Sequence, residues 1–406
     1  MKADNDLYRT LRDKACAILW KEDVAAFDRA VEPERSRLVA VIRAVGVAFA
    51  DRGTLAEKAQ AVTWLNSLLK DPSEKVRRYA MAALPKLGDD TQAEAKLLDI
   101  LAAPAGERER QKVVEALEKI GGEATLEAAL KDPSTVSVAP DRVAARIARL
   151  TEPGEISLDR VLARPSGVRI HLHCRKGLER ILADEARALV KEIFEVKSVM
   201  SGLVVLEPLK PFSLGDVYQL RCFAQVGFVL GDVRAQSPEE AINPIALRIA
   251  SNRTRDLLAA FTDGAFRYRI EMDPALGDAE LVRKIGAEVH RFDPKILNDP
   301  RESPWSVDVF AAPGGASVEL RPRLSPDPRL GYRLGEVAAG SHPPLAAAMA
   351  RLAGSYVGEV AWDPFCGSGI ELIERAMLGG ASRVIGTDLS AEAVEIARKN
   401  FEAAAV

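Results

Sequence analysis

A repeated proline turn constrains the fold of the first 150 residues more than any other feature of this 406-residue chain. The pentapeptide Leu-Lys-Asp-Pro-Ser occurs at 69–73 and again at 130–134, with a third proline turn at 101–105 between them. The turns are therefore about 30 residues apart, and the apolar residues between them recur at helical spacing. A helix–turn–helix unit of this kind cannot bury its apolar face without neighbours, so an all-α stack of repeats is predicted.

The helix after each of the first two turns follows a common pattern. Helices are predicted at 76–84, ending near Gly88, and at 110–117, ending near Gly121. The Asp-Pro-Ser turn followed by Val-Arg and a helix that ends at Leu-Gly resembles HEAT-like repeats. That resemblance implies a surface for a protein partner or for RNA, and a packing or spacer role remains equally open.

Composition narrows the class of protein. The chain has 48% hydrophobic residues and a formal net charge of −3, so it has no overall basic field to attract nucleic acid. Its four cysteines are far apart without a Cys-x-x-Cys pair, which argues against a disulfide scaffold and a zinc ribbon. No apolar run has the roughly 18–20 residues needed to cross a bilayer, and no signal segment is evident, so a cytoplasmic protein without membrane contact is expected.

The pattern of apolar and polar residues changes near 151–154, where the helical periodicity ends at a Pro-Gly pair. Residues 165–320 are predicted to form a small α/β domain that begins with a strand at 168–173 and a helix at 177–186. Further strands are predicted at 203–206, 227–233, 266–272 and 306–311, and further helices at 214–225, 238–258 and 280–290.

The opening of this domain is similar to a known RNA-binding module. It reads Arg-x-His-x-His-Cys-Arg-Lys-Gly-Leu-Glu at 169–179, then Ala-Asp-Glu at 183–185 and Tyr-Gln-Leu-Arg-Cys at 218–222. These segments resemble the THUMP-type module of RNA-modifying enzymes, over roughly residues 168–320. The resemblance implies that this domain binds RNA.

The most specific motif lies near the C-terminus. A short apolar strand at 360–363 is followed by Pro-Phe-Cys-Gly-Ser-Gly at 364–369, a helix at 370–378, a second strand at 383–387 and Asp388. Glycines leave room for a ligand at the turn, and the helix N-terminus offers free N–H groups to a carboxylate. An acid after the second strand is placed to accept hydrogen bonds from ribose hydroxyls, and Ser390 is placed to cap the next helix, at 391–402.

Two nucleotide cofactors compete for this strand–turn–helix–strand unit. A dinucleotide fingerprint requires a third glycine where this chain has Leu372, which weakens the case for NAD(P). The Asp-Pro-Phe-Cys-Gly-Ser-Gly run instead resembles motif I of S-adenosylmethionine-dependent methyltransferases that act on exocyclic amines, and Tyr332 with residues 341–349 resembles the segment that closes over their cofactor. A degenerate domain without cofactor is the remaining alternative. The predicted cofactor-binding residues are Asp363, Pro364, Phe365, Cys366, Gly367, Ser368, Gly369, Asp388 and Leu389.

Taken together, the chain resembles THUMP-containing RNA guanine-N2 methyltransferases with an added HEAT-like region. The implied organisation is HEAT-like repeats at 1–152, a THUMP-like α/β domain at 165–320 and the first part of a Rossmann-like, doubly wound methyltransferase domain at 328–406. The resemblance implies methyl transfer from S-adenosylmethionine to a guanine amine in tRNA or rRNA, with an adenine amine or DNA as variants. The family's Asn/Asp-Pro-Pro-aromatic catalytic motif does not occur after Asp388, so catalytic residues are unassigned and the chain by itself is expected to be inactive. The rival hypothesis is an RNA-binding or interaction scaffold with a vestigial cofactor domain.

Four further groups of residues are candidates for metal, catalytic, ligand or RNA contacts. His171 and His173 share one face of a strand, but no third ligand of suitable spacing is evident, so no metal site is predicted. Cys366 has no adjacent base and is interpreted as a packing residue. Glu374, one turn after Glu371, is assigned a structural role in preference to ligand contact. The predicted phosphate contacts for RNA are Arg248, Arg253, Arg255, Arg267 and Arg269.

Overall fold

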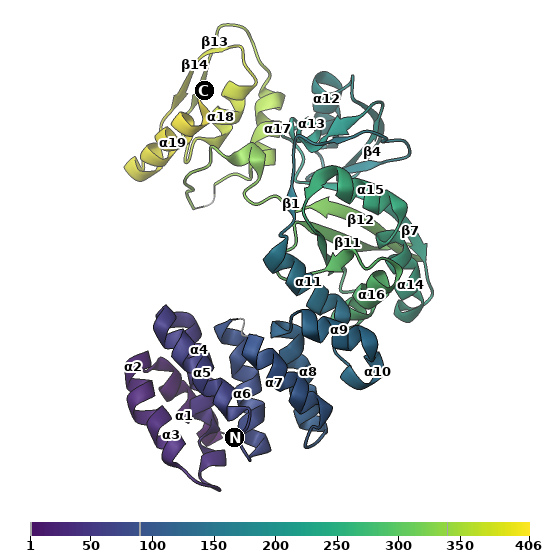
Figure 1. Cartoon of the computed structure of the whole chain (residues 1–406). Helices are drawn as coiled ribbons and strands as arrows, with labels where there is room; N and C mark the ends of the chain where they lie inside the picture. Colours follow the sequence, from purple (N-terminus) through teal and green to yellow (C-terminus); the bar gives the residue numbers. More distant parts are fainter. Residues whose placement is uncertain (1, 89–90, 339) are drawn as a thin grey trace. The chain divides into compact units, whose positions relative to one another are not determined.

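The computed structural model describes residues 2–88, 91–338 and 340–406. It divides into two compact units, Met1–Glu152 and Pro153–Val406 (Figure 1). Within the described ranges, no helix combines the length and the apolar character needed to cross a lipid bilayer.

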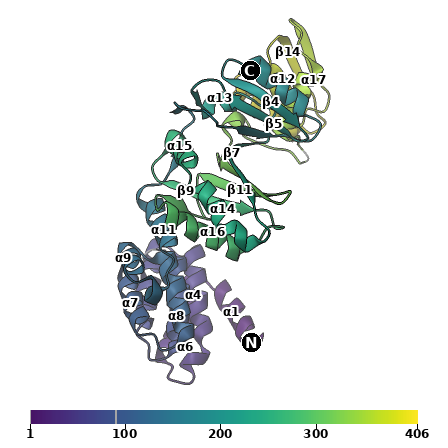
Figure 2. The same cartoon turned by 90° about the vertical axis from the view of Figure 1, so that its right-hand side faces the viewer.

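The first unit is helical throughout its described residues. Its α-helices are α1 (Lys2–Asp13), α2 (Cys16–Ile18), α3 (Ala25–Arg29), α4 (Val39–Arg52), α5 (Leu55–Leu68), α6 (Glu74–Leu87), α7 (Thr91–Ala102), α8 (Glu107–Ile120), α9 (Glu123–Lys131), α10 (Pro133–Val136) and α11 (Pro140–Thr151), with a π-helical turn at Leu19–Val24 and a 3-10 turn at Arg35–Arg37. Helices α4, α6 and α8 pack side by side (Figure 2). The helices predicted at 76–84 and 110–117 are confirmed as α6 and α8.

Buried ion pairs link consecutive repeats. Arg35 Nε donates to Asp71 Oδ2 at 2.8 Å, and Arg77 Nε donates to Glu109 Oε1 at 2.6 Å. Arg77 also donates to the Asp71 carbonyl oxygen at 2.7 Å, so one arginine contacts two successive turns. Because an unpaired buried charge is costly, these pairs fix how each repeat stacks on the next.

The second unit is built around an eight-stranded mixed sheet with the order β10-β9-β11-β12-β7-β3-β5-β4. The pairs β10–β9 and β9–β11 are parallel, and the other neighbours are antiparallel. Its strands are β3 (Ile170–His173), β4 (Phe194–Met200), β5 (Leu203–Pro208), β7 (Gln225–Arg234), β9 (Phe266–Met272), β10 (Ile296–Asn298), β11 (Trp305–Ala312) and β12 (Gly315–Pro322). Two short ribbons pair β1 (Glu155–Ile156) with β8 (Thr262–Asp263) and β2 (Val161–Leu162) with β6 (Phe212–Ser213).

Helices cover one face of this sheet and enclose the main core of the unit. They are α12 (Glu179–Leu189), α13 (Leu214–Tyr218), α14 (Pro238–Ile249), α15 (Asn252–Phe261) and α16 (Ala279–Phe292). Along β3 and β12 the core takes alternate residues, among them Ile170 and Leu172 on β3 and Leu320 on β12. Helices α14 and α16 pack together against this apolar face (Figure 1).

Two predicted helices differ from those in the structure. The helix expected at 238–258 is two helices, because Ser251 accepts a hydrogen bond from the Thr254 N–H at 3.3 Å and starts α15. The helix expected at 214–225 ends at Tyr218, and β7 begins at Gln225. Strands β4, β10 and β12 had no predicted counterpart.

The last part of the second unit holds the glycine motif. After a 3-10 turn at Pro328–Leu330 come α17 (Pro343–Ala353), β13 (Glu359–Asp363), α18 (Ile370–Met377), β14 (Ala381–Gly386) and α19 (Ala391–Ala404). Strands β13 and β14 are parallel and are connected through α18, as the sequence predicted for a strand–turn–helix–strand unit. Helix α17 packs on both α12 and α18, and its Ala347 and Ala348 join the core of the larger sheet.

Candidate functional site

The turn between β13 and α18 is held by short-range hydrogen bonds. The Phe365 N–H donates to Asp363 Oδ1 at 2.9 Å, and the Cys366 N–H donates to the Thr387 carbonyl at 3.0 Å. The Thr387 N–H in turn donates to the Asp363 carbonyl at 3.0 Å. Asp363 therefore shapes the turn and ties it to the end of β14.

Glycine is required at the start of α18 for two reasons. Gly369 has φ +79°, a left-handed conformation that other residues rarely adopt. A Cβ at this position would also lie 3.2 Å from Ala397 Cβ and 3.1 Å from the Phe401 ring on α19. The glycine thus lets α19 approach the turn, and no side chain caps the free N–H groups at the α18 N-terminus.

Asp388 closes the turn from the other strand. Its Oδ1 accepts from the Ser390 N–H at 2.9 Å and its Oδ2 from the Gly367 N–H at 2.9 Å. These two hydrogen bonds hold the Asp388 pKa below its ordinary value, so the carboxylate is charged at neutral pH. Ser390 caps α19 as predicted, by accepting from the Ala393 N–H at 3.2 Å.

A pocket of about 550 Å³ opens beside this turn. Five of the predicted cofactor residues line it: Phe365, Cys366, Gly367, Ser368 and Asp388. The other four, Asp363, Pro364, Gly369 and Leu389, are not part of its lining. Asp363 accepts a hydrogen bond within the turn, and Gly369 leaves room for α19 beside it. The Leu389 side chain is fully exposed.

Cys366 is a buried thiol within this lining. Burial raises its pKa, and the nearby Asp363 and Asp388 carboxylates act in the same direction. A thiol kept protonated is a poor nucleophile. This supports the interpretation of Cys366 as a packing residue.

Ser341, in the 341–349 segment that resembles the segment closing over the cofactor, also lines the pocket, whereas its acidic members were not predicted as ligand contacts. Glu336, Glu371 and Glu392 contribute three carboxylates in addition to Asp388, and Val337 and Ile396 are apolar members of the lining. Glu371 lies on the first turn of α18, whereas Glu392 and Ile396 come from α19. A pocket with this charge favours a ligand that carries positive charge over one that carries a pyrophosphate.

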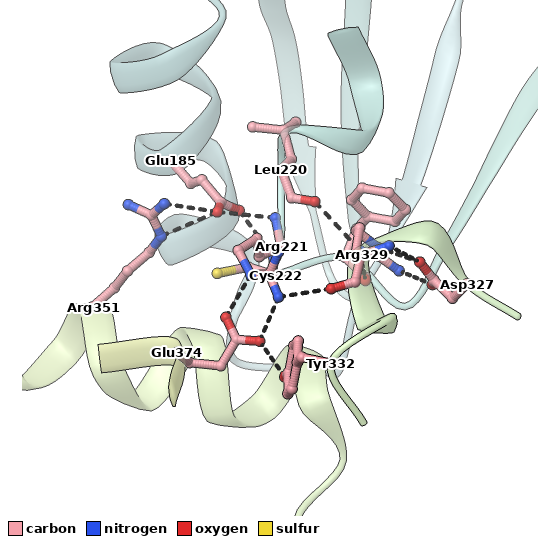
Figure 3. A network of polar contacts seen from close by, with 10 residues as sticks. Glu185, Leu220, Arg221, Cys222, Asp327, Arg329, Tyr332, Arg351 and Glu374 are labelled. Atoms are coloured by element: carbon pink, nitrogen blue, oxygen red, sulfur yellow. Dashed lines mark hydrogen bonds and ion pairs between the residues drawn. The ribbon is translucent and has the colours of Figure 1, made fainter. Parts of the chain in front are cut away.

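Glu374 connects helix α18 to the loop between α13 and β7 (Figure 3). This buried carboxylate, 2% exposed, accepts from Arg221 Nε at 2.6 Å and from Arg221 Nη2 at 2.8 Å. The Tyr332 hydroxyl donates to the same carboxylate at 2.7 Å, and burial raises the Tyr332 pKa. Both Glu374 carboxylate oxygens thus accept hydrogen bonds from Arg221 or Tyr332, which supports the interpretation of Glu374 as a structural residue.

A second carboxylate joins α12 to α17 (Figure 3). Glu185 accepts from the backbone N–H groups of Arg221 and Cys222 at 3.0 Å and 2.9 Å. It also accepts from Arg351 Nε at 3.1 Å. The loop that carries Arg221 is thus bonded to two helices, to α12 through Glu185 and to α18 through Glu374.

Two of the predicted RNA contacts lie on β9. Arg267 is 3% exposed, and its Nη1 donates to Asp299 Oδ2 at 2.8 Å. Arg269 is half-buried and lies 2.5 Å from the Glu271 carboxylate. The prediction that Arg267 contacts RNA phosphates is wrong, because its guanidinium is buried in an ion pair with Asp299.

The other three are exposed on consecutive helices. Arg248 lies on α14, and Arg253 and Arg255 lie on α15. Arg248 donates to the Asp232 carbonyl at 3.2 Å, and Arg255 pairs with Asp293 at 2.8 Å. Arg253 and Arg248 therefore have their charges available to solvent on the surface of the second unit.

Two segments of the chain match models of known protein families. Residues 331–406 match an RMKL-like methyltransferase domain, and residues 37–139 match HEAT repeats. The curated proteins contain no match to the chain. The match at 331–406 agrees with the predicted methyltransferase region and with S-adenosylmethionine as its cofactor, and the match at 37–139 agrees with the predicted HEAT repeats.

Solved structures similar to the chain include three methyltransferase-related proteins. TrmN from Thermus thermophilus is 22% identical, with 59% of this chain and 70% of that chain covered and a TM-score of 0.46. A predicted N6-adenine-specific DNA methylase from Listeria monocytogenes is 17% identical, with 58% and 72% covered and a TM-score of 0.45. SMU.472, a putative methyltransferase complexed with SAH, is 17% identical, with 60% and 73% covered and a TM-score of 0.44.

Proposed function

We propose that the chain is an RNA methyltransferase that uses S-adenosylmethionine to methylate the N2 amine of a guanine in tRNA or rRNA. In this proposal residues 1–152 are a HEAT-like repeat domain for a protein or RNA partner, 165–320 a THUMP-like RNA-binding domain and 328–406 the methyltransferase part. The observation that carries the proposal is the acidic pocket at the glycine turn. Its lining combines the matched motif with four carboxylates: Asp388, Glu336, Glu371 and Glu392.

The charge of the pocket supports the choice of cofactor. S-adenosylmethionine has a sulfonium cation and an ammonium group, whereas NAD(P) has an anionic pyrophosphate. We place the ribose hydroxyls at Asp388, whose carboxylate is charged, and the methionine carboxylate at Gly367–Gly369, where α18 offers free N–H groups. The pocket residues hold and orient the cofactor, so that its methyl group reaches the amine by proximity.

Calorimetric titration of S-adenosylmethionine tests the cofactor site. We expect the wild-type chain to bind, and Asp388→Ala to bind at least about tenfold more weakly, because a charge-assisted hydrogen bond to the ligand is lost. Glu395→Ala is the matched control, since Glu395 is an exposed carboxylate on α19 that is not part of the pocket lining. A folded wild-type chain that binds no cofactor would instead favour a scaffold with a vestigial domain.

The RNA part of the proposal is supported by the exposed arginines. We expect tRNA binding to weaken in an Arg248→Ala, Arg253→Ala double variant, because both side chains offer solvent-facing charge for phosphates. The slope of log binding constant against log salt concentration is negative, and its magnitude should decrease by about 0.9 for each phosphate contact to duplex that is lost. An Arg187→Ala, Arg291→Ala double variant is the control of equal charge, since these side chains are 55% and 61% exposed and pair with Asp184 and Glu288.

Because the chain by itself is expected to be inactive, the modified base is tested with this chain joined to a segment that carries the Asn/Asp-Pro-Pro-aromatic motif, by transfer of labelled methyl groups to RNA. Nuclease digestion and chromatography would separate N2-methylguanosine, the expected product, from N6-methyladenosine. Label in adenosine would redirect the proposal to an adenine amine. Label in duplex DNA and none in RNA would contradict it.

A further inference from the structure

Two histidines and one glutamate meet on the face of the large sheet that points away from its core. His171 and His173 alternate along β3 with the core residues Ile170 and Leu172, so both imidazoles lie on the opposite face. His171 Nδ1 is 2.6 Å from Glu319 Oε1, and His173 Nε2 is 2.8 Å from Glu319 Oε2. The sequence did not indicate a third side chain that could bind a metal ion together with the two histidines, because Glu319 follows His173 by 146 residues.

A glycine allows Glu319 to reach both histidines. Glu319 lies on β12 and the histidines on β3, and β7 runs between these two strands. At this level β7 has Gly227, which pairs with His171. A Cβ at Gly227 would lie 2.3 Å from Glu319 Oε2. Any other residue at Gly227 would occupy the space that the carboxylate crosses.

The charge of this cluster is unbalanced when the imidazoles are neutral. Glu319 is 2% exposed, and among the described residues no lysine or arginine forms an ion pair with it. A buried carboxylate without a countercharge is costly. A divalent cation that binds to the carboxylate and to both imidazole nitrogens would supply that charge.

We propose that His171, His173 and Glu319 form a binding site for a divalent transition-metal ion of the zinc type. Two imidazoles and one carboxylate are a common ligand set for zinc with an open fourth position. The three ligand atoms lie within 4.8 Å of one another, close to the roughly 3–4 Å that separates ligand atoms around one zinc ion. The histidine side chains are 17% and 28% exposed, so the ion can enter from solvent and keep a water ligand. The bound ion joins β3 to β12 across β7.

Zinc titration of the full chain after treatment with a chelator tests this site. We expect one zinc ion per chain by calorimetry at neutral pH, and a rise of Tm when zinc is added. His171→Ala and Glu319→Gln should each weaken binding by more than about 100-fold, since changing only a hydrogen-bond partner of a ligand costs roughly 10–100-fold. His290→Gln is the matched control, because His290 lies on α16 and is not one of the three clustered residues.

Two further measurements do not depend on removing a ligand. Gly227→Ala retains all three ligands but places a methyl group where the carboxylate lies, so zinc binding should be lost while helix content by circular dichroism is kept. Cobalt added to the wild-type chain should give visible absorption bands that equimolar zinc abolishes. The proposal is wrong if the wild-type chain binds no zinc or shows no such cobalt bands, or if the His171 variant binds zinc as tightly as His290→Gln does.

Discussion

Glu109 shows how a single buried carboxylate stabilises the helical repeats. It is 1% exposed, and it accepts from Arg77 Nε at 2.6 Å and from the Ala105 N–H at 2.7 Å. Burial alone would raise its pKa, but the hydrogen bonds from Arg77 and Ala105 outweigh burial and lower it. The folded chain therefore binds a proton at Glu109 less readily than the unfolded chain does.

Glu109→Gln should lower the free energy of unfolding by about 3 kcal/mol at neutral pH, because Arg77 loses the charge of its buried partner. A lowered pKa contributes stability that is present above the ordinary glutamate value of 4.5 and is lost as pH falls through the folded value. The difference between wild type and variant should thus shrink as the pH falls below that value. Urea unfolding followed by circular dichroism at several pH values measures it.

Glu115→Gln on the same helix is the control for this prediction. Glu115 pairs with Lys112, and both side chains are exposed, so its loss should cost less than about 1 kcal/mol. An equal cost of Glu109→Gln at neutral and at acidic pH would show that the Arg77–Glu109 charge pair is not the source of the stability.

Some roles that depend on the residue type at a single position could be predicted from the sequence, whereas contacts between distant residues could not. The positive φ of Gly369 and the cap at Ser390 are local features, so the need for a glycine and for a capping serine there follows from the sequence alone. The burial of Arg267 and the approach of Glu319 to β3 depend on the order of strands in the sheet. No spacing along the chain reveals either of them.

At the scale of elements, α18 joins the glycine motif to the large sheet. Ser368 and Glu371, at its N-terminal end, line the pocket, and Glu374 on its next turn pairs with Arg221 from the loop before β7 (Figure 3). Anchoring at Glu374 therefore restricts the position of two pocket residues. The sequence predicted α18 itself but not its partner, because Arg221 is 153 residues away.

A double-mutant cycle tests this anchor. Arg221→Ala and Glu374→Ala should each destabilise the second unit by about 3 kcal/mol, because each leaves a largely buried charge without its partner. The double variant should cost less than the sum by at least about 1 kcal/mol, and each single variant should also weaken cofactor binding. Tyr332→Phe, which removes one hydrogen bond, should cost about 1 kcal/mol. Additive costs in the cycle would show that Arg221 and Glu374 do not act as a pair.

Some boundaries of helices and strands are set by residues close in the sequence, and others depend on pairing with distant segments. The expected helix at 238–258 did not account for Ser251, a residue type that favours helix starts, so the break between α14 and α15 has a local signal in the sequence. Strand β12 (Gly315–Pro322) pairs with the preceding strand β11 and also with β7, whose Arg234 lies 81 residues before its partner Gly315, and only the second pairing joins distant parts of the chain. Local signals thus predicted most helices, whereas several strands required the assembled sheet.

At the scale of the whole molecule, the two units have separate hydrophobic cores. In sequence order, the last buried residue of the first unit's core is Val143, and the first buried residue of the core on the large sheet is Leu162. Burial in one core therefore contributes little to the free energy of unfolding of the other, and two-state unfolding of the full chain is not expected.

Matched core substitutions test this independence by calorimetry. Leu117→Ala in the first core and Leu320→Ala in the second each remove a fully buried leucine, which costs about 3 kcal/mol. Each variant should lower the Tm of one transition and leave the other unchanged, and Leu117→Ala should leave cofactor affinity at the wild-type value. A single transition that both variants lower equally would mean that the two cores unfold together. Cofactor binding could then be altered by any change in the repeats that affects stability, because the pocket would share one unfolding equilibrium with them.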